Sequence, residues 1–100
     1  MTNFASISPS EANNLIANHE AVVIDIRDEG SYQNGHIEGA TQLDNSSIAG
    51  FIDNADQHLP LIIYCYHGIS SQSAAAYFAD HGFTSVYSVE GGYEAWKEAL

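Results

Sequence analysis

Apolar positions along this chain follow two different periods. Short runs rich in β-branched residues, typical of buried strands, alternate with segments whose apolar residues recur every three or four positions, typical of helices. The runs predict strands over residues 21–26, 40–43, 61–64 and 86–89, and the periodic segments predict helices over 9–18, 48–52, 70–81 and from Gly92 onward. This alternation predicts an α/β fold with a parallel sheet.

Several helix ends carry their own signals. Ser8-Pro9-Ser10-Glu11 combines an N-cap, a proline at the first helical position and a capping-box glutamate. Pro60 marks the entry to strand 61–64, Gly82 closes helix 70–81, and Gly91-Gly92 form a turn into the last helix. Between Asp28 and Gly39 the sequence predicts a loop.

The length and charge of the chain limit its organisation and its partners. One hundred residues can build one core, so we expect a single domain over residues 1–100. Thirteen acidic side chains against two basic ones, Arg27 and Lys97, give a formal net charge of −11. Such a chain repels polyanions, so we expect neither nucleic acid nor an anionic membrane as a partner. No apolar run approaches a membrane span of about 18 residues, and residues 1–4 do not resemble a leader, so we expect a soluble, unexported protein.

The single cysteine, Cys65, lies between the predicted strand 61–64 and the loop that leads into helix 70–81. A strand, a glycine-containing loop and a helix N-terminus direct several backbone N–H groups at one point. We expect the N–H groups from Tyr66 to Ser71 to hold Cys65 as a thiolate nucleophile. A lone thiol, which we expect to be exposed, favours the reducing cytoplasm. Inert packing is the alternative role for Cys65, and the turn at Gly68 argues against it.

The residues after Cys65 are candidates for binding an anion. They are Tyr66, His67, Gly68, Ile69, Ser70 and Ser71. Gly68 permits backbone angles that other residues resist, so the chain can approach the sulfur closely. For Ser70 and Ser71 we expect helix capping by the hydroxyl, with donation to the anion as the alternative. For His67 we expect a role in lining the entrance, with a charge that lowers the thiol pKa as the alternative.

Other polar residues are expected to have structural roles. We expect Arg27 to pair with Asp25, Asp28 or another carboxylate rather than reach the site, and His36 to make a structural hydrogen bond between motifs. No metal is expected, because metal-ligand spacing is absent among the five histidines, which are His19, His36, His58, His67 and His81.

Four short motifs occur in order along nearly the whole chain. They are Asp25-Ile26-Arg27-Asp28, Gly35-His36-Ile37-Glu38-Gly39-Ala40, the loop from Cys65 to Ser71, and Gly91-Gly92 with Trp96. Together they resemble the motifs of the single-domain rhodanese family, in particular thiosulfate sulfurtransferases of the GlpE type. The resemblance implies a rhodanese-like fold, in which helices flank both faces of a parallel five-stranded sheet.

The same resemblance implies sulfane sulfur transfer without a cofactor. Cys65 would take the outer sulfur of thiosulfate as a persulfide and pass it to cyanide or to a thiol acceptor such as thioredoxin. The alternative is a sulfur-carrier or regulatory binding module that a protein partner loads. A phosphatase of the Cys-x5-Arg type is a further rival. The loop here is one residue shorter and lacks the arginine that would clamp phosphate, which argues against this rival.

Overall fold

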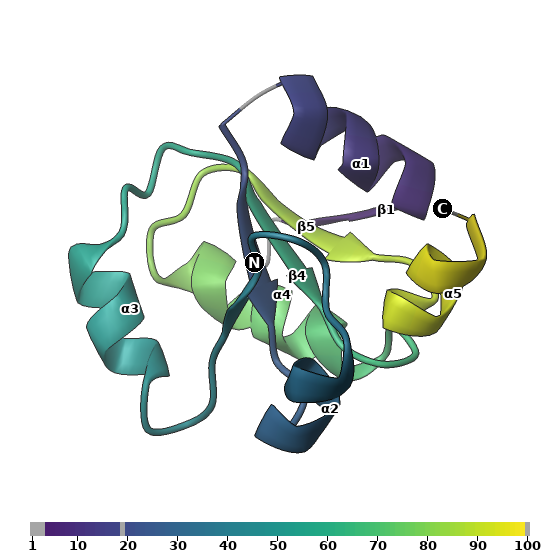
Figure 1. Ribbon diagram of the computed structural model, residues 1–100. Helices are drawn as coiled ribbons and strands as arrows, with labels where there is room; N and C mark the ends of the chain where they lie inside the picture. The colour runs from purple at the N-terminus through teal and green to yellow at the C-terminus, as the bar shows by residue number, and fades with distance from the viewer. Residues whose placement is uncertain (1–3, 19, 100) are drawn as a thin grey trace.

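The computed structural model describes residues 4–18 and 20–99, which form a parallel sheet between two layers of helices (Figure 1). The five strands pair in the order β1-β5-β4-β2-β3, and the four pairings between them are all parallel. Their bounds are β1 Ala5–Ile7, β2 Val22–Asp25, β3 Thr41–Gln42, β4 Leu61–Tyr64 and β5 Val86–Val89. The strand that leads to Cys65, β4, is therefore the central strand.

Helices cover both faces of this sheet, as predicted (Figure 1). Their bounds are α1 Pro9–Asn18, α2 Glu29–Asn34, α3 Ile48–Asn54, α4 Ser70–Asp80 and α5 Gly92–Ala99. Residues of α1, α2 and α5 pack against one face, and residues of α3 and α4 pack against the other. No helix of the described residues is long and apolar enough to cross a membrane.

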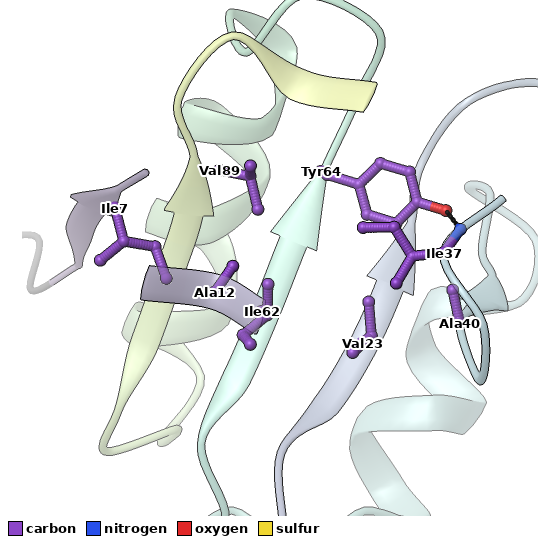
Figure 2. Close-up of a cluster of buried hydrophobic side chains, with 8 residues drawn as sticks. All are labelled: Ile7, Ala12, Val23, Ile37, Ala40, Ile62, Tyr64 and Val89. Atoms are coloured by element: carbon purple, nitrogen blue, oxygen red, sulfur yellow. Dashed lines mark hydrogen bonds between the residues drawn. The ribbon is translucent and has the colours of Figure 1, made fainter. Parts of the chain in front are cut away.

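Side chains of β4 alternate between the two faces and so join both cores. Ile62 and Tyr64 belong to the core beneath α1 and α5, whereas Leu61 and Ile63 belong to the core beneath α3 and α4. All four side chains are almost completely buried. Figure 2 shows the first core, where the hydroxyl of Tyr64 accepts the N–H of Ile37 at 3.1 Å. Because both faces of β4 are fixed, the end of the strand holds Cys65 in a defined position.

The capping box predicted at the start of α1 is present. The Ser8 N–H donates to Glu11 Oε1 at 2.9 Å, and the Glu11 N–H donates to Ser8 Oγ at 3.1 Å. These two bonds satisfy donors that would otherwise lack partners at the helix start. The N–H and the hydroxyl of Ser8 lower the pKa of the Glu11 carboxyl.

Two elements differ from the sequence prediction. The segment expected to be a loop after Asp28 contains helix α2, which begins where the Asp28 carboxylate accepts the Ser31 N–H at 3.0 Å. The short edge strand β1 was also missed, and it pairs with β5 so that Ile7 lies opposite Val89. Neither element shows a strong apolar pattern, because α2 buries none of its residues and β1 buries only Ile7.

Candidate active site

The loop after β4 folds its backbone around the sulfur of Cys65. The Gly68 N–H donates to Sγ at 3.1 Å, and the Ser71 N–H donates to Sγ at 3.3 Å. Gly68 has φ +87°, a backbone conformation that L side chains rarely adopt, so a glycine at this position allows the turn. The predicted N–H cradle is therefore present, and two of its amides make hydrogen bonds to the sulfur.

Residues of helices α5 and α4 also bond to this loop. The Tyr93 N–H donates to the Cys65 carbonyl at 2.8 Å, and the Glu94 N–H donates to the Tyr66 carbonyl at 3.1 Å. The Gln72 side chain donates to the Gly68 carbonyl at 2.9 Å. The carbonyl oxygens of Cys65, Tyr66 and Gly68 are therefore bonded to other groups. The backbone groups that bond to Sγ are N–H groups.

Ser71 contributes its hydroxyl to the sulfur, and this corrects the capping role expected for it. Ser71 Oγ lies 3.4 Å from Cys65 Sγ and 2.8 Å from Ser88 Oγ, and both serines are almost completely buried. Helix α4 begins after Ile69 without a side-chain cap, so the capping expected for Ser70 is not found either. When the sulfur is a thiolate, which can only accept, the Ser71 hydroxyl donates to it, and the Ser88 hydroxyl can donate to Ser71 in turn.

These contacts decide the ionisation of Cys65. Burial favours the neutral thiol and would raise the pKa of Cys65, but the Ser71 hydroxyl and the N–H groups of Ser71, Gly68 and His67 outweigh burial, so the pKa is lowered. A lower pKa gives a larger thiolate fraction at neutral pH, and the thiolate is the nucleophilic form. The residue as a whole is 6% exposed. The expectation of an exposed thiol was therefore wrong, because the loop closes over the sulfur.

Replacing Ser71 by alanine is expected to raise the pKa of Cys65, because the thiolate loses a hydroxyl donor while the neutral thiol loses little. The pH profile of alkylation by iodoacetamide should shift to higher pH, and the rate at pH 7 should fall several-fold. Ser70→Ala is the matched control, because Ser70 is the exposed neighbour, and the bonds to the sulfur within the described residues come from Gly68 and Ser71 instead. An equal profile in both variants would contradict this role for Ser71.

The remaining loop side chains lie at the rim. Ile69 is 74% exposed and Tyr66 is 44% exposed. The His67 ring stacks on the Tyr66 ring at 4.7 Å, and its Nδ1 lies 3.2 Å from Glu94 Oε1. This places the imidazole at the entrance, where its lining role stays a prediction. Glu94 as its partner was not foreseen, and neither was Ser88, whose only signal was a polar residue inside an apolar strand.

Arg27 makes the ion pair that was expected. Its Nη2 lies 2.7 Å from Asp25 Oδ2, both side chains are buried, and the same Nη2 donates to the Gly35 carbonyl at 2.6 Å. Burial would lower the pKa of Arg27, but the hydrogen bond and charge of Asp25 outweigh it and raise that pKa. The pair therefore joins the end of β2 to the end of α2, next to the end of β4.

The hydrogen bond of His36 is local. Its Nδ1 lies 2.8 Å from the carbonyl of Tyr32, and the two rings stack at 3.8 Å. The contact joins His36 to α2 rather than to another of the four motifs. Among the described residues no group of three or more histidine, cysteine, aspartate or glutamate side chains is placed to hold a metal ion. His19 lies outside the described residues.

Comparison with known proteins agrees with this architecture. The model of the rhodanese-like domain family matches residues 8–99. The thiosulfate sulfurtransferase GlpE of Pseudomonas entomophila is 56% identical over 97 residues, which cover 97% of this chain and 88% of that protein. The GlpE of Shewanella oneidensis is 46% identical over 99 residues, which cover 99% of this chain and 98% of that protein.

Solved structures show the same fold. A rhodanese-related protein from Thermoplasma volcanium superposes with a TM-score of 0.82 at 23% identity, over 96% of this chain and 93% of that one. A rhodanese-like domain protein from Staphylococcus aureus superposes with a TM-score of 0.80 at 24% identity, over 93% and 91%. With a family match over almost the whole length and relatives at about half identity, the chain belongs to the rhodanese-like domain family.

Proposed function

We propose that this protein is a thiosulfate sulfurtransferase in which Cys65 is the nucleophile that carries the sulfur. The observation that carries the proposal is the set of hydrogen-bond partners around Sγ, namely the N–H groups of Gly68 and Ser71 and the Ser71 hydroxyl, which donates once the sulfur is a thiolate. Relatives of about 50% identity that bear the name thiosulfate sulfurtransferase support it.

The first half of the reaction forms a persulfide. The Cys65 thiolate attacks the outer sulfur of thiosulfate, a sulfur–sulfur bond forms, and the bond to the sulfonate group breaks with its electron pair, so sulfite leaves as a dianion. The total charge is unchanged, because a thiolate and a dianion become a persulfide anion and a dianion. The same N–H groups that stabilise the thiolate face the charge that spreads over the outer sulfur, which is the arrangement of an anion hole.

The second half returns the thiolate. A nucleophile attacks the outer sulfur of the persulfide and leaves with it, so cyanide becomes thiocyanate and a thiolate acceptor becomes a persulfide. Because sulfite departs before the acceptor reacts, the kinetics are expected to be ping-pong. We propose a cellular thiol, such as a thiol of thioredoxin, as the acceptor in the reducing cytoplasm.

The direct test is the intact mass after incubation with thiosulfate. The protein should gain one sulfur atom, and Cys65→Ser should gain none, because the chain has no other cysteine. Cys65→Ser should also abolish thiocyanate formation from thiosulfate and cyanide. A mass gain that persists in Cys65→Ser would overturn the assignment. Sulfur uptake with negligible thiocyanate turnover would instead favour the sulfur-carrier function.

A further inference from the structure

A pocket beside the Cys65 loop gathers both basic residues of the chain. It has a volume of about 210 Å³ and is lined chiefly by Arg27, Ser31, Asn34, Tyr66, Tyr93 and Lys97. The chain has thirteen acidic residues, and none of them lines this pocket. Two other pockets have the opposite charge. Asp44 lines one and Glu38 lines the other, and no arginine or lysine lines either of them. We call the first one the Arg27–Lys97 pocket.

The Arg27–Lys97 pocket adjoins the sulfur site through the chain itself. Tyr66, one of its walls, directly follows Cys65, and Tyr93, another wall, donates its N–H to the Cys65 carbonyl at 2.8 Å. The pocket and the sulfur site therefore share the Cys65–Tyr66 segment of the loop. A group that occupies this pocket lies beside Tyr66 and Tyr93, the two residues that flank or bond the backbone of Cys65.

The two cations of the pocket differ in how much of their charge is available. Arg27 is neutralised by the buried carboxylate of Asp25, and its guanidinium lies over the Tyr93 ring at 4.3 Å, which fixes it in place. Lys97 is exposed, and the structure gives it no carboxylate partner within residues 4–18 and 20–99. Its Nζ lies 5.4 Å from the centre of the Tyr93 ring and 6.0 Å from that of Tyr66. The available positive charge of the pocket is therefore mainly that of Lys97.

We propose that the Arg27–Lys97 pocket binds the oxyanion group of sulfur substrates, and that Lys97 selects for such substrates. The inference deepens the proposed function, since it concerns which sulfur compounds reach Cys65. The shared chemistry is a sulfonate or carboxylate group attached close to the reacting sulfur, as in thiosulfate itself or in a small thiol acid. An ammonium group beside two aromatic rings attracts such a group and forms charge-assisted hydrogen bonds with it.

Lys97 also lies in the last turn of α5, where a positive charge stabilises the helix through its interaction with the helix dipole, whether or not the pocket binds an anion. A purely structural role would change the stability of the protein but would not distinguish charged from neutral reagents. The test must therefore compare two reagents that differ only in charge and react at the same sulfur.

Iodoacetate and iodoacetamide provide this comparison, because they have nearly the same shape and both alkylate Cys65. The ratio of their rates cancels any change in the thiol pKa. In Lys97→Gln the ratio of iodoacetate to iodoacetamide should fall about five-fold, the effect of one charge acting across several ångströms near a protein surface. Lys97→Arg should retain most of the wild-type ratio. The measurement is the loss of free thiol with time at low salt.

Asn54→Asp is the matched control for net charge. It changes the formal charge by the same single unit as Lys97→Gln, from −11 to −12, at an exposed residue that ends α3 and lines none of these pockets. Its ratio should equal that of the wild type. Equal ratios in all variants, or an equal fall in Asn54→Asp and Lys97→Gln, would overturn the proposal.

Kinetics then identify which substrate uses the pocket. With ping-pong kinetics, kcat/KM is separate for donor and acceptor, so thiosulfate, 3-mercaptopropionate and neutral 2-mercaptoethanol can be compared. A fall for thiosulfate in Lys97→Gln assigns the pocket to the donor, and a fall for 3-mercaptopropionate alone assigns it to the acceptor. If neither falls, the selection proposed for Lys97 is wrong. Failure of the wild type to take up sulfur contradicts the proposed function instead, and the alkylation ratio still reports on the pocket.

Discussion

Gly68→Ala is expected to lower kcat/KM by at least about a hundred-fold, because a displacement of about 1 Å at a reacting group costs that much. A Cβ atom at this position would lie 2.7 Å from the Gly91 nitrogen and 3.1 Å from the Val89 carbonyl oxygen. Both are backbone atoms, so the loop must move and take its donors away from the sulfur. Strain at φ +87° and overpacking add up to a loss of about 2–5 kcal/mol in the free energy of unfolding. Thiocyanate formation and urea denaturation measure the two effects.

Gly39→Ala separates these contributions. Gly39 has φ +86°, nearly the angle of Gly68, but a Cβ there would meet nothing within 4 Å. This variant therefore carries the backbone strain alone, which costs about 1–2 kcal/mol, and it should keep its activity. If Gly68→Ala is as active as Gly39→Ala, close packing of the loop against the β5–α5 turn is not needed for the reaction.

Arg27→Met should lower the free energy of unfolding by about 3–5 kcal/mol, the usual cost of leaving one partner of a buried ion pair alone. Methionine preserves much of the apolar stem but removes the charge, so Asp25, which is completely buried, keeps a carboxylate with no cation. The double variant Asp25→Asn with Arg27→Met removes both charges and should be more stable than Arg27→Met alone. Urea denaturation at pH 7 measures both variants.

An exposed pair provides the control for this result. The side chains of His67 and Glu94 are 61% and 52% exposed, so Glu94→Gln should change the free energy of unfolding by no more than about 0.5 kcal/mol. A loss in Arg27→Met no larger than that in Glu94→Gln would show that the buried pair contributes little to the fold.

The central part of the fold could be predicted from sequence because burial dominates it. The strand over residues 61–64 is apolar at every position, since both its faces are covered, and such a run has few alternatives. Edge elements lack this signal. In β1 two of three residues are exposed, and α2 begins at an Asp28 cap but has no apolar periodicity. These elements form because the remainder of the fold provides their partners.

The candidate site also has one part that the sequence predicts and one part that it does not. The N–H groups around Cys65 follow from a strand, a glycine turn and a helix in succession, which are local in sequence. Ser71 is also bonded to Ser88, seventeen residues further along the chain, and no local pattern reports that contact. Capping is the average behaviour of serine at a helix start, and here the tertiary contact overrides it.

The recessed position of Cys65 has a consequence for which sulfur chemistry is accessible. A disulfide between two copies needs Cα atoms about 4.4–6.8 Å apart, and the rim that leaves Cys65 only 6% exposed keeps two folded copies from that approach. A persulfide adds one sulfur atom beyond Sγ at a bond length of about 2 Å, and an acceptor has to reach only this outer atom. The bare thiol is thereby shielded from dimerisation, while the transferable atom is offered to an incoming acceptor only once it has been loaded.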